Sequence, residues 1–464
     1  LGDVYKRQIV HLGHSVPTAL TEVELSGPEG QLPRWELVNL AGEPTRDEDS
    51  DGTVHLSWSW RELKPAPADQ PPAPRELTMP YLVYSNHPEW GDLATWYERH
   101  TAPRVRSSHQ VEELSQRLTE GVTDRMERID RIYRFVTMDI EYVGLEFGEH
   151  RFRPFSADWV LNHRIGDCKD KATLLVALYR AIDIPARLVM VRTAERGVPA
   201  NRLAVLENFN HAIAYLPEDD LWLDGTASGH AMFPPPTMIQ GAQVLVVDGP
   251  ESTPQITSSP GGGLARSRYR LSRADDGVVE LEVRTEDTGE AADRRRVQIA
   301  GSRDPRRIAR WLQSQFPGAD LVEDPELRLV PGQDPALVEL RAEVSRSALL
   351  GAGGIRSFPG EVDWAAQLTP SSERVTPLLV PVRPDLEWQL EVDLGRPPQP
   401  LPEEVRLESP HGQLALTYDE KATGYLVEGS FSLTPGIVQG SEIGELREFL
   451  LAVERHMERR LEVP

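Results

Sequence analysis

Alternating apolar and polar residues predict strands in the first part of the chain. Residues 35–40 (WELVNL) and 54–60 (VHLSWSW) place apolar side chains at nearly every second position, which is the period of a half-buried strand. An acidic, glycine-containing turn separates the two runs, and a proline-rich stretch follows at 64–74. Because proline and turn residues interrupt regular structure, the pattern predicts a partial β-domain over residues 9–78.

From about residue 91 the apolar residues recur at steps of three and four, as on one face of a helix. Residues 169–182 are apolar almost all round, which is typical of a buried helix. Pro185 should end that helix, because proline disfavours helical backbone in the residue before it. Strands are expected at 187–192, 209–216 and 221–227. These elements predict an α+β domain over residues 79–250.

Short strand-like runs dominate the rest of the chain, after a glycine-rich linker at 258–263. One helix is expected near 305–315 and a final helix at about 442–461. We therefore expect a β-rich region over residues 251–464 that ends in a helix. Its strands are expected at 278–283, 338–344, 386–392 and 425–433.

Charge and composition exclude several classes of function. The chain has 73 acidic and 50 basic residues, a net charge of −23. Such a charge repels phosphate backbones, so we expect no nucleic-acid partner. No apolar run approaches the roughly 18 residues that a membrane span needs, so no integral membrane segment is expected. With one cysteine, an internal disulfide and a multi-cysteine metal site are excluded, and no metal or cofactor is predicted.

The start of the chain has an unusual composition. It begins with Leu1 rather than methionine, and residues 1–8 (LGDVYKRQ) resemble translated adaptor sequence. We expect these residues to be non-native, and the natural N-terminus, with any secretory signal, to be missing.

The single cysteine, Cys168, has a sequence context that favours reactivity. Asp167 is a good helix N-cap, which places Cys168 in the first turn of the buried helix. The helix dipole and free backbone N–H groups favour a thiolate there. Lys169 and Lys171 add positive charge nearby, whereas Asp167 and Asp170 oppose it.

A nucleophilic thiol also needs a base and a group that orients the base. His211 lies on one strand of the hairpin predicted at 209–227, and Asp224 lies on the other. If the turn between them has an even number of residues, His211 faces Thr226 and Asp224 is its diagonal neighbour on the same side. An odd-numbered turn would separate the two side chains. The order helix cysteine, strand histidine, strand aspartate is papain-like; His163, just before the helix, is the competing base.

Three short motifs resemble the core motifs of the transglutaminase-like superfamily: residues 166–175 (GDCKDKATLL), 210–212 (NHA) and 222–227 (WLDGTA). The most similar form is the bacterial type that carries a domain-of-unknown-function family 3857 region at its N-terminus. The resemblance covers about residues 85–250. It implies a central papain-like, transglutaminase-core domain flanked by β-sandwich-like domains. It also implies that Cys168 is the nucleophile, His211 the base and Asp224 the orienting group. Gly225 departs from the pattern, since many relatives have proline there.

The oxyanion hole is less well defined by the sequence. The backbone N–H of Cys168 is the default donor, because a helix N-terminus directs donors at negative charge. A second donor should come from the preceding segment. Asn162, Arg164 and the indole of Trp159 are the candidates, and Trp159 is equally consistent with a core position.

These residues predict thiol-dependent acyl chemistry on amide bonds of a protein or peptide substrate. By family analogy, hydrolysis by a peptidase or amidase is favoured. Two alternatives stay open: transamidation, in which an amine resolves the thioester, and a non-catalytic scaffold of the cell envelope. A periplasmic or exported location is implied by the resemblance alone.

Overall fold

The computed structural model describes residues 8–462 apart from 66, 68, 146, 200, 274–277, 301–304, 331–334, 361 and 396–399. The first seven residues of the predicted adaptor segment thus lie outside the described residues. The chain divides into two compact units. The first unit holds both the predicted N-terminal and central parts. It comprises Leu1–Ser228, Met238–Ser259 and Val375–Leu379, and the second unit comprises Gly229–Thr237, Pro260–Arg374 and Val380–Pro464.

The N-terminal part of the first unit consists of two small antiparallel sheets that share a hydrophobic cluster. Trp58 of one sheet and Leu82 of the other are both buried in it. The predicted strands at 35–40 and 54–60 are present as β3 (Arg34–Val38) and β5 (Thr53–Leu63), and the predicted boundary after residue 78 falls just before β6 (Tyr81–Ser85). One sheet has the order β1 (Ile9–His11), β6 (Tyr81–Ser85), β3 (Arg34–Val38), and the other the order β2 (Thr18–Pro28), β5 (Thr53–Leu63), β4 (Thr45–Glu48). The short helix α1 (Arg75–Thr78) connects β5 to β6.

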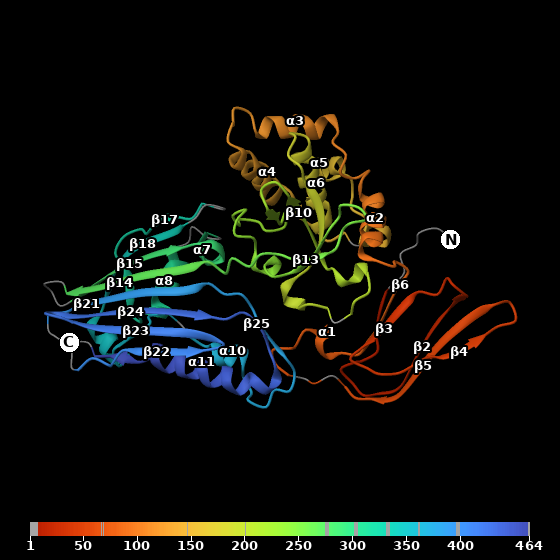
Figure 1. The fold of residues 1–464 in the computed structure, drawn as a ribbon. Coiled ribbons are helices and arrows are strands. Elements are labelled where there is room, and N and C mark those ends of the chain that lie inside the picture. The colour runs from red at the N-terminus through yellow and green to blue at the C-terminus, as the bar shows by residue number, and fades with distance from the viewer. Residues whose placement is uncertain are drawn as a thin grey trace. The chain divides into compact units, whose positions relative to one another are not determined.

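The central part places helices against a sheet, with the helix of the cysteine between them (Figure 1). This helix, α6 (Cys168–Arg180), is buried at every position from Lys169 to Tyr179, as its continuous apolar pattern predicts. It contacts the strands β9 (Arg187–Arg192) and β10 (His211–Leu216). It also contacts the helices α3 (His109–Leu118), α4 (Arg125–Asp139) and α5 (Ala157–His163). The sheet has the order β11 (Leu221–Leu223), β10 (His211–Leu216), β9 (Arg187–Arg192), β12 (Gln243–Val246), β13 (Pro254–Ile256).

The other elements of the first unit lie around this layer. The helices are α2 (Trp90–Thr101), α3 (His109–Leu118), α4 (Arg125–Asp139) and α5 (Ala157–His163), and the parallel pair is β7 (Glu141–Tyr142) with β8 (Ile165–Gly166). Short 3₁₀ turns are η1 (Gly148–Arg151), η2 (Ala194–Arg196) and η3 (Leu206–Asn208). Among the described residues, the helices are too short or too polar to cross a membrane.

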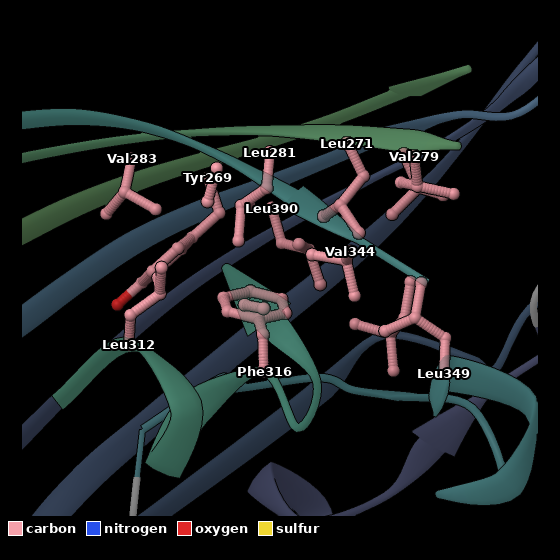
Figure 2. Close-up of a cluster of buried hydrophobic side chains, with 14 of the residues drawn as sticks. Tyr269, Leu271, Val279, Leu281, Val283, Leu312, Phe316, Val344, Leu349 and Leu390 are labelled. Atoms are coloured by element: carbon pink, nitrogen blue, oxygen red, sulfur yellow. The ribbon is translucent and has the colours of Figure 1, made fainter. Parts of the chain in front are cut away.

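The second unit is built on one long mixed sheet, which corrects the β-sandwich predicted for this region. One side of the sheet packs on helices instead of on a second sheet, and Leu312 and Phe316 insert between its side chains (Figure 2). The strand order is β16 (Ala319–Leu321), β18 (Ala336–Val344), β15 (Val279–Asp287), β14 (Leu264–Arg273), β21 (Asp385–Asp393), β24 (Gly424–Leu433), β23 (Gly412–Lys421), β22 (Val405–Ser409), with β17 (Glu326–Arg328) also on β18. β14 and β21 are parallel.

Helices and short strands complete the second unit. Apolar residues at alternate positions of β15 and β18 face the helices, and most charged residues face away. Asp287, at the end of β15, is the buried exception, and it pairs with Arg295. The helices are α7 (Gly289–Ala300), α8 (Pro305–Gln315), α9 (Arg346–Gly351), α10 (Trp364–Leu368) and α11 (Ile443–Met457). The short elements are β19 (Ile355–Arg356), β25 (Gly436–Val438), β26 (Arg460–Leu461) and η5 (Gly440–Glu442), while η4 (Thr237–Ile239) and β20 (Leu378–Val380) span the points where the chain passes between the units.

Candidate active site

Cys168 is the first residue of α6, and a capping box holds the start of this helix. The side chain of Asp167 accepts a hydrogen bond from the backbone N–H of Asp170 at 3.3 Å. In return, the side chain of Asp170 accepts one from the backbone N–H of Asp167 at 3.1 Å. The predicted N-cap is therefore confirmed, and the two carboxylates occupy donors that would otherwise be unpaired. The helix dipole favours negative charge at this position.

Four charged residues surround this first turn, and each is buried. Lys169 forms an ion pair with Asp167, and Lys171 donates to the backbone carbonyl of Ile140 at 2.7 Å. Burial, together with the charge of Asp167, raises the pKa of Asp170 to about 6. Burial lowers the pKa of Lys171 to about 8, against the opposing effect of Asp224. The two lysines are thus held by partners of their own.

His211 and Asp224 meet across the hairpin of β10 and β11. His211 Nε2 lies 2.8 Å from Asp224 Oδ2, and the side chains are 8% and 0% exposed. The strands pair Ala214 with Leu223 and Leu216 with Leu221, so the intervening turn has an even number of residues. This is the register in which the sequence analysis expects the two side chains to meet.

Asp224 is held rigidly by its other oxygen. Its Oδ1 accepts hydrogen bonds from the backbone N–H of Thr226 at 2.8 Å and from its hydroxyl at 2.7 Å. Burial opposes ionisation of Asp224, but the charge of His211 and these hydrogen bonds outweigh it and lower the pKa below its usual value. Asp224 is therefore an ionised, fixed acceptor for the imidazole.

The imidazole of His211 strongly favours its protonated form. Burial alone would lower its pKa, but the negative charge of Asp224 and hydrogen bonds to Asp224 and Cys168 raise it to about 10. Because Nε2 faces Asp224, Nδ1 is the ring nitrogen left for the sulfur. An imidazolium beside Cys168 favours the thiolate, which is the nucleophilic form of a cysteine.

Cys168 and His211 open onto a cleft of about 380 Å³. Its walls come from the N-terminal sheet, from α1, α2 and η1, and from the loops before β10. The phenol of Tyr97 is nearly inaccessible to bulk solvent, lies at the cleft and donates to the carbonyl of Phe152 at 3.0 Å. The cleft is lined by Ile9, His11, Glu76, Tyr97, Arg151, Phe152, Cys168, Lys169, Met190, Arg196, Leu206, Glu207, Phe209, Asn210, His211 and Ala212.

The candidates for the second oxyanion donor are not among the residues that line this cleft. Trp159 stacks between Phe155 and His163, with ring centroids 3.9 and 4.1 Å away. Arg164 ends α5 in the left-handed conformation, at a φ of 59°, and its guanidinium lies over the ring of Phe135. Asn162 is exposed on α5. The helical backbone thus directs these side chains elsewhere, although they are close to Cys168 in sequence.

His163 is likewise placed away from the cleft. Its Nδ1 lies 2.8 Å from the carbonyl of Trp159, and its ring continues the aromatic stack of α5. Of the two histidines considered as the base, the structure brings His211 to the cysteine.

The sequence analysis did not single out Tyr97, nor the buried roles of Asp170 and Lys171. The role of Asp170 could have been predicted from sequence, since an acid three residues after Asp167 is the pattern of a capping box.

The glycine at position 225, where many relatives have proline, is explained by its surroundings. A Cβ there would lie 3.1 Å from Lys171 Cβ and 3.2 Å from Leu175 Cδ1, so the close approach of α6 favours glycine.

Comparison with known proteins identifies the central domain. Residues 112–224 match the family model of the transglutaminase-like superfamily, and the match contains Cys168, His211 and Asp224. The chain contains a transglutaminase-like domain. The match does not reach the N-terminal sheets, so their resemblance to family 3857 stays a prediction.

Solved structures extend the likeness at the level of fold. A "putative protease" from Parabacteroides distasonis superposes with a TM-score of 0.65, at 16% identity, over 98% of this chain and 74% of its own. A "putative cysteine protease" from Cytophaga hutchinsonii, also 16% identical, covers 47% of this chain and 71% of its own, but its TM-score of 0.22 carries no argument. No curated protein matches the chain.

Proposed function

We propose that the transglutaminase-like domain hydrolyses amide bonds of peptides through a thioester, as a cysteine peptidase or amidase. The observation that carries the proposal is the linked arrangement of Asp224, His211 and Cys168 at the cleft. The carboxylate lies 2.8 Å from the imidazole, and the sulfur lies at the start of a buried helix. This set supplies a nucleophile, a proton donor and a group that orients the donor.

In acylation, the Cys168 thiolate attacks the carbonyl carbon of the substrate amide. The carbon–sulfur bond forms, and the resulting oxyanion is stabilised by backbone N–H groups at the start of α6. The His211 imidazolium then gives its proton to the amide nitrogen. The carbon–nitrogen bond breaks, the amine leaves, and the acyl group remains on Cys168 as a thioester.

In deacylation, the neutral His211 takes a proton from water as the water oxygen attacks the thioester. The carbon–sulfur bond breaks, which releases the carboxylic acid and restores the thiolate and the imidazolium. Asp224 keeps the imidazole in one orientation and stabilises its positive charge throughout. General acid–base help of this kind contributes about 10²- to 10⁴-fold in rate.

The proposal is tested with a pool of synthetic peptides whose new termini are detected by mass spectrometry. Cleavage should occur with the full chain and disappear with Cys168→Ala, while the control Arg131→Gln, on the exposed side of α4, should keep it. A covalent acyl adduct on Cys168, captured by acid quenching, would identify the thioester. Cleavage that persists in Cys168→Ala would refute the mechanism.

Adding a dansylated primary amine distinguishes hydrolysis from transfer. Hydrolysis predicts new carboxyl ends without dansyl incorporation, even with the amine in excess. Dansyl attached to the acyl half of the peptides would instead assign transamidation to the same thioester. Absence of both products and of the adduct would refute the enzymatic proposal and favour the scaffold alternative.

A further inference from the structure

The rim of the catalytic cleft presents two arginines, each of which is more exposed than its acidic partner. The side chain of Arg196 is 39% exposed and lies 3.9 Å from Glu76, which is 14% exposed. The side chain of Arg151 is 53% exposed and lies 3.2 Å from Glu207, which is 10% exposed. Both arginines line the cleft. The positively charged guanidinium groups of Arg196 and Arg151 are therefore more accessible to an entering molecule than the carboxylates are.

Glu76 does not neutralise the cations around it, because a second guanidinium shares its carboxylate. Arg192 is 1% exposed, and its Nη2 lies 3.8 Å from Glu76 Oε1. A buried arginine keeps its proton because the unperturbed pKa of a guanidinium is above 12. Two positive charges therefore face one carboxylate, and the group has one charge in surplus.

Arg192 also fixes the loop that carries Arg196. Its guanidinium donates to the backbone carbonyls of Gly197 at 2.6 Å, Asn208 at 3.0 Å and Arg196 at 3.1 Å. The buried side chain of Arg192 thus fixes the backbone at Arg196. Because this loop is already ordered when the chain folds, binding a ligand does not add the entropy cost of ordering it. A cation that is positioned in advance binds an anion more tightly than a mobile one does.

Glu207 has backbone partners that limit its effect on Arg151. Its Oε2 accepts from the backbone N–H groups of Gln8 and Ile9 at 2.9 and 2.8 Å. Oε1 is the atom that meets Arg151, whose guanidinium also lies 5.0 Å from the ring centroid of Phe152. The planar guanidinium has five N–H donors, and among the described residues only a donor on Nη2 has an acceptor, Glu207. The others can bind a further acceptor.

We propose that this rim selects peptides that carry a carboxylate close to the amide bond under attack, with Arg196 and Arg151 as the recognition residues. A guanidinium binds a carboxylate through paired N–H donors, which gives direction as well as attraction. The local charge matters more in this chain than in most, because its net charge of −23 repels acidic peptides from the surface in general. The proposal deepens the proposed function, but the charge at the cleft can be measured without turnover.

The first experiment uses Cys168 as its own probe, since the chain has no other cysteine. The rates of alkylation by iodoacetate, an anion, and by neutral iodoacetamide are measured on the full chain. Their ratio cancels the fraction of thiolate and reports the electrostatic field at the cleft. Arg196→Gln should lower the ratio by about twofold to fivefold at low ionic strength, and Arg151→Gln should lower it in the same direction.

Two control variants show whether the change in ratio comes from charge at the rim. Arg196→Lys keeps the positive charge and should keep the ratio near that of the natural chain. Arg131→Gln removes a charge from a similar exposed ion pair with Glu127 on α4, outside the cleft lining, and should leave the ratio unchanged. An equal ratio in the natural chain and Arg196→Gln would overturn the proposal, as would an equal fall in Arg131→Gln.

The second experiment identifies the source of the carboxylate by protection of Cys168 from iodoacetamide. Three peptides are compared: acetyl-Ala-Glu-Ala-amide, acetyl-Ala-Gln-Ala-amide, and acetyl-Ala-Gln-Ala with a free C-terminal carboxylate. Better protection by the first assigns an acidic side chain, and better protection by the third assigns a peptide C-terminus. In both cases Arg196→Gln should remove the advantage. Equal protection by all three peptides would overturn the inference, whereas loss of peptide cleavage alone would concern only the proposed function.

Discussion

The active-site region of the first unit and the solvent side of the long sheet in the second unit use charged residues in opposite ways. In the transglutaminase-like domain, Asp170, Lys171 and Asp224 are all nearly inaccessible to solvent and have partners within the same small region. In the second unit, ion pairs such as Arg266–Glu387 and Arg270–Glu391 join neighbouring strands on the solvent side of the long sheet. The core under that sheet is apolar.

This difference indicates which charges matter for folding and function. Removing one partner of a buried pair costs about 3–5 kcal/mol, because it leaves an uncompensated charge in a medium of low polarity. An exposed pair contributes about 0–1 kcal/mol, because water screens it and two long side chains lose freedom. We therefore expect the active-site region to be sensitive to changes in charge and the long sheet to be sensitive to changes in packing.

The largest effect is expected from Asp224→Asn. An amide cannot stabilise the imidazolium, and we expect kcat/KM for peptide cleavage to fall by about 10²- to 10⁴-fold.

The dependence of activity on pH should change as well in Asp224→Asn. In the natural chain His211 stays protonated until its pKa of about 10, so activity should decline only above that pH. Without the charge of Asp224, the pKa of His211 loses its main raising contribution while burial still lowers it, so the alkaline decline should begin at lower pH. An unchanged profile would show that Asp224 does not control His211.

Next in size is the effect of Phe316→Ala on the second unit. Phe316 is 1% exposed and lies among the core side chains beneath the sheet (Figure 2). Removing a buried aromatic ring costs about 3–5 kcal/mol of unfolding free energy, measured by denaturant titration followed by circular dichroism. The control is Val297→Ala on α7, where the side chain is 74% exposed. Similar losses in the two variants would contradict a packing-dependent second unit.

Asp170→Ala should destabilise the first unit by about 2–4 kcal/mol. The carboxylate accepts from the backbone N–H groups of Phe155 at 2.8 Å and Asp167 at 3.1 Å, and alanine leaves both donors, the second of them buried, without this acceptor. Because burial raises the pKa of Asp170 to about 6, the charged form is costly at neutral pH, which offsets part of this loss. Thermal unfolding measures the change. Asp139→Ala, an exposed position at the end of α4, is the control and should differ little from the natural chain.

The smallest effect is expected from Arg266→Gln in the second unit. This arginine donates to Glu387 at 2.8 Å, but both side chains are well exposed. We expect a change of less than about 1 kcal/mol in unfolding free energy, and a smaller change still at 1 M salt. A loss as large as that from Asp170→Ala would remove the distinction between the active-site region and the solvent side of the long sheet.

The site motifs could be interpreted from sequence because each depends on local structure. Asp167 is a strong N-cap, so the helix start and the position of Cys168 follow from a few residues. The meeting of His211 and Asp224 could be predicted only conditionally, because one residue more or less in the turn would reverse the side of the sheet that Asp224 faces. The structure provides the even-numbered turn.

The oxyanion candidates illustrate where local reasoning ends. Asn162, Arg164 and Trp159 are near Cys168 in the chain, yet the helical geometry of α5 directs Trp159 into an aromatic stack and Arg164 onto Phe135. The strands predicted at 338–344, 386–392 and 425–433 are present in the second unit, but their common sheet is not the predicted sandwich. An alternating pattern shows which side of a strand is buried, and either a helix layer or a second sheet can cover that side.

The sequence by itself determined many of the elements and the chemistry-bearing motifs, because periodicity, capping and turn residues act over a few positions. Only the tertiary structure decided which charges are buried and which residues share the cleft. Glu76, Arg151, Arg196 and Glu207 come from separate segments and have no common pattern in the chain. The electrostatic interaction between these side chains depends on the distances between them and on the low polarity of their surroundings. Both are set only when the chain has folded.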